Sequence, residues 1–253
     1  MGALLTPPKI TGAKGKSKGD VLIPATAATG ALVLAICIRQ IAAAGLDMRH
    51  LAWLGLAALT LLVGRFSIRL PLPNCRVSLS DASIFLSLLA FGPALATVTG
   101  AMDGLASSTR GTTWYKRVFN SAGMAVSVFL SSHAFTLLLP AGGLRAQEMS
   151  SSQLLLPVAT LAIVQYLLNT ALVSAVVCLK ESVPPRKVWH DASPWAGVGY
   201  LTGLAAAAFI FLAVREIGVG AALAVLPYPA VPYLTFRTCL GRLAKVKKKS
   251  STA

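Results

Sequence analysis

RVSLSDASIFLSLLAFGPALATVTGAMDG, residues 76–104, carries a Gly-Pro pair near the centre of an apolar run. The run is long enough to cross a bilayer once, at roughly 20 residues per crossing. Proline inside a helix removes a hydrogen bond and clashes with the preceding turn, and an unsatisfied backbone group is costly in hydrocarbon. The stretch is therefore either one interrupted crossing or two shorter helices that turn at Gly92 and Pro93.

Apolar residues dominate the rest of the chain as well. Of its 253 residues, 55% are hydrophobic and only 12% are charged, and the mean hydropathy is +0.71. A soluble domain carries about twice that share of charged residues. Long apolar runs recur along the chain, which is typical of a polytopic helical membrane protein. Hydropathy predicts six full crossings outside the opening stretch: 21–44, 51–64, 119–140, 154–179, 196–214 and 218–236.

The basic residues are interpreted as topology determinants. The net charge is +15, but the lysines and arginines lie in short loops and tails between apolar runs. There they are expected to contact anionic lipid headgroups, and no nucleic-acid partner is predicted. We expect one transmembrane domain at residues 21–236, flanked by basic cytoplasmic tails at residues 1–20 and 237–253.

Counting Lys and Arg decides between the two readings of the opening stretch. If residues 81–105 cross once, 14 basic residues lie inside and 9 outside. If they turn and return to the same side, 19 lie inside and 4 outside. The positive-inside rule favours the second distribution. We predict an all-α polytopic protein of a bacterial plasma or inner membrane. It has about six full transmembrane helices plus a re-entrant helical hairpin at 81–105, and both termini are cytoplasmic.

Local residue types support a hairpin of two helices. Asp81 suits the first turn of the first helix because it complements the helix dipole, and Pro93 suits the first turn of the second. Ala96, Gly100 and Gly104 recur at a four-residue spacing. This small-residue face is either a surface for close helix packing or a chance result of an alanine-rich chain.

The hairpin also contains two carboxyl groups, Asp81 and Asp103, which need a partner or water at membrane depth. One interpretation is a structural clasp between these carboxylates and nearby arginines. The other is a polar vestibule that binds a small, anionic ligand beneath the hairpin. The remaining candidate residues for either arrangement are Arg69, Arg76, Arg110, Arg117 and Asn120.

A second group of polar residues lies in the later apolar runs. Gln165 and Asn169 are four residues apart and share one helix face, and His133 is the only histidine within an apolar run. These three residues could form a polar spot inside the bundle. They either join helices by hydrogen bonding or form a ligand or proton site.

No hydrolase triad, HExxH motif or phosphate-binding glycine loop is present in the sequence. The four cysteines, Cys37, Cys75, Cys178 and Cys239, do not have metal-site spacing, and disulfides are not expected. We therefore predict no enzyme activity, no catalytic residues, no metal and no cofactor.

One family resemblance rests on SLSDASIFLSLLAFGPALA (78–96), the AMDG that follows (101–104), RFSIRLPLPNCRVSLSDA (65–82) and WYKRVFNSAGMA (114–125). These segments resemble the S components of energy-coupling-factor (ECF) transporters. They resemble still more the ECF-like membrane domains fused to bacterial GGDEF and HD-type signalling domains. The resemblance covers about residues 51–214, with its specific part at 65–125, and the runs at 21–44 and 218–236 are additional to the S-component pattern.

The resemblance implies a non-enzymatic sensory module that binds a small molecule and passes a signal to a partner chain. An alternative is an S-component-like transport subunit, which would need energising partner subunits because the chain has no P-loop motif. A second alternative, independent of the resemblance, is an intramembrane lipid-modifying enzyme.

Overall fold

The computed structural model describes residues 19–45, 47–63, 67–69, 76–78, 80–107, 113–140, 146–181, 183–218 and 220. Within these residues the chain forms seven α-helices, one short 3-10 helix and one two-stranded ribbon. In chain order the elements are α1 (Gly19–Ala44), α2 (Met48–Val63), β1 (Ser67–Arg69), β2 (Arg76–Ser78), α3 (Ser80–Phe91), α4 (Pro93–Ala106), α5 (Trp114–Leu137), η1 (Ala146–Glu148), α6 (Ser151–Glu181) and α7 (Pro185–Ile217).

The Gly-Pro pair forms the tip of a helical hairpin, as predicted. Gly92 links α3 to α4 with φ +97° and ψ 179°, a conformation that glycine adopts far more cheaply than other residues, and Pro93 begins α4. The hydroxyl oxygens of Ser87 and Thr99 lie 3.1 Å apart from opposite sides of the break, so the two helices run back along each other. With 12 and 14 residues, α3 and α4 are about 18 and 21 Å long, shorter than a hydrocarbon core of about 30 Å.

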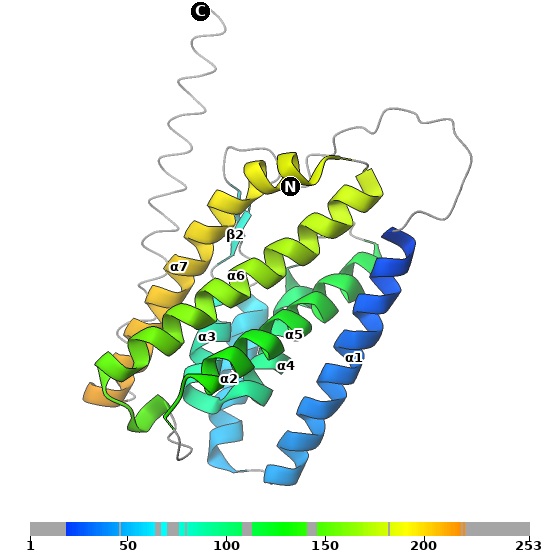
Figure 1. Ribbon diagram of the computed structural model, residues 1–253. Helices are drawn as coiled ribbons and strands as arrows, with labels where there is room; N and C mark the ends of the chain where they lie inside the picture. The colour runs from blue at the N-terminus through cyan, green and yellow to red at the C-terminus, as the bar shows by residue number, and fades with distance from the viewer. Residues whose placement is uncertain are drawn as a thin grey trace, which may run out of the picture.

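Helix α5 is the central element of the bundle. It packs against α4, α6 and α1, and α3 packs against α7 on the other side of the hairpin. Figure 1 shows α5 between α1 and α6, with α7 at the edge beyond the hairpin. In the most apolar window of α5, 56% of the residues are buried, against 22% to 28% in the other three long apolar helices. The largest buried side chains of the core come from α3, α5, α6 and α7.

The small-residue face of α4 is a packing surface, which answers the question that the sequence left open. Ala96 is fully buried. A Cβ atom added to Gly100 would lie 2.7 Å from a methyl carbon of Val128, and one added to Gly104 would lie 2.5 Å from the carbonyl oxygen of Asn120. Both contacts are with α5, so α4 and α5 pack with their backbones close together.

Among the residues that the structure describes, four helices are long and apolar enough to cross a membrane: 21–44, 114–137, 151–180 and 199–217. They match four of the six predicted crossings. The predicted crossing at 51–64 corresponds to α2, which has only 16 residues. The predicted crossing at 218–236 lies almost wholly outside the described residues, as do most of the predicted tails. Large apolar side chains, among them Leu32, Leu155 and Phe209, are exposed on the outside of the bundle, as expected for a lipid-facing surface.

The two ends of the bundle differ in charge. The "basic end" is where α5 begins, α6 ends and α7 begins, and it carries five exposed basic residues: Lys116, Arg117, Lys180, Arg186 and Lys187. The "tip end" contains Gly92; there Arg49 and Gln147 both donate hydrogen bonds to the carbonyl oxygen of Ala90, at 3.1 and 2.7 Å. This separation agrees with the charge distribution predicted for the hairpin. Which end faces the cytoplasm stays a prediction.

The described residues form an all-α bundle, as predicted, with one short ribbon of β1 and β2 that the sequence did not predict. The strands are antiparallel, and Arg69 stands opposite Arg76 in their register. β2 contacts α7 and leads directly into the start of α3.

Candidate functional site

The hairpin places both of its carboxyl groups near its open end. Asp81 lies in the first turn of α3 and Asp103 in the last turn of α4. The Ser80 hydroxyl, which is fully buried, donates a hydrogen bond to the Asp103 carboxylate. The Asp81 and Asp103 carboxyls are also close enough to interact electrostatically. The turn at Gly92 is therefore what brings together two acidic residues that are 22 positions apart.

Asp103 is the more deeply buried of the two, with 5% of its surface exposed, whereas Asp81 is partly buried. One carboxylate oxygen of Asp103, Oδ1, is buried and has no hydrogen-bond partner among the described residues. In the same part of the chain, neither carboxyl forms a salt bridge with a basic side chain. The predicted clasp between aspartate and arginine is thus not seen in the described residues.

Helices α6 and α7 complete this polar site. The Asn169 side-chain nitrogen donates a 2.6 Å hydrogen bond to the hydroxyl oxygen of Tyr200, a residue with 6% of its surface exposed. The Tyr200 ring also contacts Phe85 of α3, which lies one helical turn from Asp81. Gly203 faces Asp81, and a Cβ added there would lie 2.9 Å from the Asp81 Cβ. We call Ser80, Asp81, Asp103, Asn169 and Tyr200 the acidic site.

Aromatic rings surround the Tyr200 side of the acidic site. The ring of Tyr200 makes edge contacts with Phe85 and Tyr166, at centroid distances of 6.3 and 6.1 Å. Tyr166 in turn lies 6.4 Å from Trp189, whose side chain is 38% exposed near the basic end. These contacts hold Tyr200 in place between α3 and α6.

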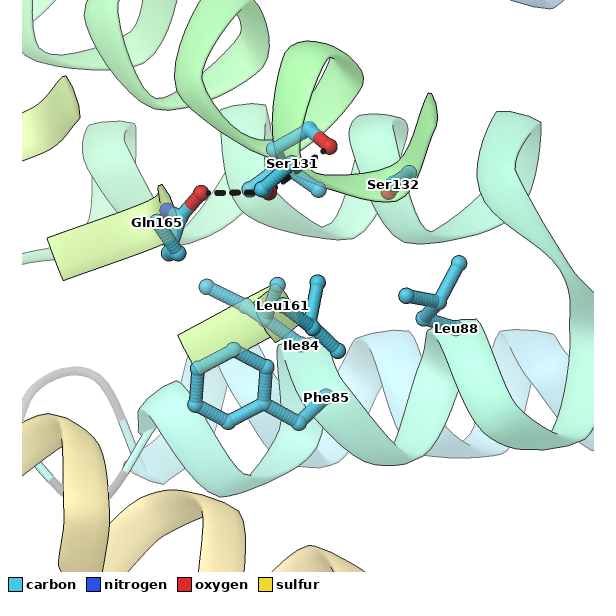
Figure 2. Close-up of a pocket in the computed structure, with 8 residues that line it drawn as sticks. Ile84, Phe85, Leu88, Ser131, Ser132, Leu161 and Gln165 are labelled. Atoms are coloured by element: carbon cyan, nitrogen blue, oxygen red, sulfur yellow. Dashed lines mark hydrogen bonds between the residues drawn. The ribbon is translucent and has the colours of Figure 1, made fainter. Parts of the chain in front are cut away.

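A second polar contact lies one helical turn along α6 from Asn169. The Ser131 hydroxyl donates a 2.8 Å hydrogen bond to the carbonyl oxygen of the Gln165 side chain (Figure 2). Gln165 Nε2 and Ser132 Oγ are buried without a partner among the described residues. Both residues line a small space bounded by apolar side chains of α3, which include Ile84 and Phe85. That space has no room for a water molecule.

The structure separates His133 from the two residues with which it was grouped. Gln165 and Asn169 both point into the bundle, but they contact different partners, Ser131 and Tyr200. His133 is exposed and its Nδ1 contacts the carbonyl oxygen of Phe129. Helix α5 turns by about 100° per residue, so residues two positions apart, such as 131 and 133, face different directions.

Of the other candidate residues, the structure describes the side chains of Arg117 and Asn120. Arg117 is exposed at the basic end, and Asn120 is partly buried on α5 with its backbone carbonyl against Gly104. For Arg69 and Arg76 only the backbone is described, as paired strand residues. Arg110 lies outside the described residues.

Sequence reasoning missed Tyr200 and Ser131. Each is an ordinary residue in its own helix, and only its partner on another helix makes it part of a polar site. It also missed that Trp53 of α2 donates a 2.9 Å hydrogen bond to the Thr99 hydroxyl of the hairpin. Tyr200 lies near the start of the predicted crossing at 196–214, where tyrosines commonly sit at the membrane interface. Its position alone therefore did not indicate a role in a polar site.

No family model, no curated protein and no solved structure matches this chain. The resemblance to ECF-like membrane domains therefore stays a prediction.

Proposed function

We propose that this chain is a non-enzymatic membrane module that binds a small ligand at the acidic site. The observation that carries the proposal is the convergence of polar side chains from α3, α4, α6 and α7 inside an otherwise apolar bundle. Ionisable residues at such depth are costly in hydrocarbon and commonly serve a function. The resemblance at residues 65–125 supports the same role.

The packing suggests how binding could be passed on. The acidic site joins the open end of the hairpin to α6 and α7, and α3 approaches α7 closely at Gly203. A ligand that contacts Asp81 or Asp103 on the hairpin and Tyr200 on α7 would favour one spacing of these helices over another. Since α7 and α6 both continue to the basic end, a change in spacing there would be available to a partner chain.

The proposal is tested by ligand-dependent stabilisation of the purified protein in detergent. Fractions of a small-molecule cell extract are screened for a rise in the melting temperature, since a ligand that binds the folded state stabilises it. We expect one or more fractions to stabilise the wild type. Tyr200→Phe, which removes only the hydroxyl, and Asn169→Leu should reduce this effect.

Tyr115→Phe is the matched control, because it makes the same change at the basic end, where the Tyr115 ring lies beneath the Lys180 ammonium at 5.1 Å. The control should keep the full ligand response. A wild type that no fraction stabilises would contradict the proposal. So would stabilisation that is undiminished in both Tyr200→Phe and Asn169→Leu.

A further inference from the structure

We propose that the acidic site holds one compact cation, Na⁺ or a proton, between the Asp81 and Asp103 carboxyl groups. The inference rests on the proposed function, because it assigns the chemical class of a ligand for the same site. It replaces the anionic ligand that the sequence suggested, since two carboxylates repel an anion.

The first argument is the pairing of two carboxyl groups at one end of the hairpin. Asp81 and Asp103 come from the two arms of the hairpin and interact electrostatically, and Asp103 is 95% buried. In the described residues no basic side chain forms a salt bridge with either group. A buried carboxylate beside a second carboxylate is strongly unfavourable unless a cation or a proton compensates the charge.

The second argument is the unpartnered oxygen. Asp103 Oδ1 is buried and accepts no hydrogen bond from any described residue. The Asp103 carboxylate does accept a hydrogen bond from the Ser80 hydroxyl. Buried acceptors of this kind nearly always have a partner in native proteins. The oxygen therefore indicates a ligand that accepts an electron pair, either an alkali ion or a proton.

The third argument concerns size. Helix α7 packs so closely against the start of α3 that a Cβ added to Gly203 would lie 2.9 Å from the Asp81 Cβ and 3.2 Å from the backbone nitrogen of Ala82. An organic ammonium ion would need the helices to separate, whereas a bare Na⁺ ion is smaller than water and a proton needs no cavity. Carboxylate and hydroxyl oxygens, such as those of Asp81, Asp103 and Tyr200, are the ligands that hard cations prefer.

The groups that face the two carboxyls also favour a single positive charge. Helix α7 contributes the hydroxyl of Tyr200 and α6 contributes the amide of Asn169. On α5, the residues beside the end of α4 are Asn120 and Ser121, which carry no charge. Within the described residues, no third carboxylate or histidine is available to form a multivalent metal site.

The test measures the melting temperature of the full chain in detergent under two sets of conditions. In the first, NaCl replaces choline chloride at constant ionic strength and neutral pH. In the second, the pH is varied in choline chloride without sodium. For a sodium site we expect a saturable rise of about 2–4 °C, the size of shift produced by a ligand at a few times its Kd in a chain of this length.

For a proton site the sodium response is absent, and the melting temperature falls as the pH rises, because deprotonation leaves an uncompensated charge on the buried Asp103 carboxyl group. Asp103→Asn replaces the carboxylate with a neutral amide that carries no charge for a cation or a proton to compensate. This variant should abolish the sodium response or the pH response, whichever the wild type shows. Glu216→Gln, a matched change at an exposed carboxylate that pairs with Arg215, should leave it intact. If Asp103→Asn is not monodisperse by size-exclusion chromatography, Asp81→Asn takes its place.

A wild type that responds neither to Na⁺ nor to pH overturns the cation proposal, and so does a response that both aspartate variants retain. The outcome is separable from that of the proposed function. If an extract fraction stabilises the wild type through Tyr200 but Na⁺ and pH have no effect, the ligand-binding role stands and the cation assignment falls. If none of the three has an effect, both proposals fall.

Discussion

At the scale of single residues, Gly104 offers the sharpest test of the packing between α4 and α5. A Cβ at this position would lie 2.5 Å from the Asn120 carbonyl oxygen and 2.7 Å from the Ser121 Cα. Both are backbone atoms, so α4 must move away from α5. We expect Gly104→Ala to lower the free energy of unfolding by about 1–3 kcal/mol, measured as a lower melting temperature in detergent.

Gly123→Ala is the control for this change. Gly123 also lies in a helix and is buried, but a Cβ added there would meet no atom within 4 Å. Alanine has the higher helix propensity, so this variant should be as stable as the wild type or slightly more stable. Equal melting temperatures for the two variants would contradict the close approach of α4 to α5.

The hydrogen bond between Ser131 and Gln165 leads to a second residue-scale prediction. Ser131→Ala removes the only partner of the Gln165 side chain among the described residues, and Gln165 is 1% exposed. We expect a loss of about 1 kcal/mol, within the range found for such bonds inside membranes. Gln165→Leu in the same background removes the buried amide altogether and should restore part of this loss.

A double-mutant cycle on the melting temperature checks this prediction. If Gln165→Leu alone and Ser131→Ala alone have additive effects, the bond seen in Figure 2 does not contribute to stability.

The residue scale also shows how far sequence reasoning could identify the site. Asp81, Asp103, Gln165 and Asn169 were identified by residue type alone, because polar groups are rare in apolar runs. Their partners were not, since the Ser80 and Tyr200 contacts depend on how α3 and α7 are rotated against their neighbours. His133 was included in error for the same reason: its exposed position depends on the rotation of α5.

At the scale of elements, the tip of the hairpin gives a prediction about backbone conformation. Gly92 has φ +97°, and no atom lies within 4 Å of a Cβ added there. The cost of Gly92→Ala is therefore backbone strain without a steric clash, and we expect about 1–3 kcal/mol. The matched variant is Gly55→Ala in α2, where the space is also open but the residue is helical. It should be neutral or stabilising.

Thermal denaturation of both variants checks this expectation. If Gly92→Ala is as stable as Gly55→Ala, the hairpin does not require a positive φ at its tip.

Local sequence patterns predicted the break in the hairpin but not the ribbon or the packing of α2. The break at Gly92 was predictable because proline and glycine act on their own backbone. The ribbon of β1 and β2 was not, because three-residue strands have too few side chains to show a period and depend on each other for pairing. The 16 residues of α2 read as a crossing by hydropathy, although Trp53 on this helix hydrogen-bonds Thr99 of the hairpin.

At the scale of the whole molecule, the separation of the two ends predicts which residues react from the same side of a membrane. Single cysteines are introduced at Lys180 and Ser107 near the basic end and at Gln147 at the tip end, after the native cysteines are replaced. We expect a membrane-impermeant thiol reagent to label Lys180→Cys and Ser107→Cys from one side and Gln147→Cys from the other.

Ser107 is the informative position because it follows α4 and so shows on which side the hairpin ends. Lys180 and Gln147 lie near opposite ends of α6 and serve as references for the two sides. Labelling of Ser107→Cys on the side of Gln147→Cys would mean that residues 81–105 cross the membrane. Labelling on the side of Lys180→Cys is expected for a hairpin that returns to the end where it began.

The sequence by itself determined the membrane-protein class, the position of most helices, the hairpin with its tip at Gly92 and Pro93, and the polar residues that needed a partner. These follow from hydropathy, charge counting and the local chemistry of proline and glycine, all of which act over a few residues. Only the tertiary structure decided that Gly100 and Gly104 face α5, that Gly203 packs against Asp81, and that Asn169 bonds Tyr200. The physical reason is that contacts between helices depend on their relative rotation and height, which no single segment of sequence specifies.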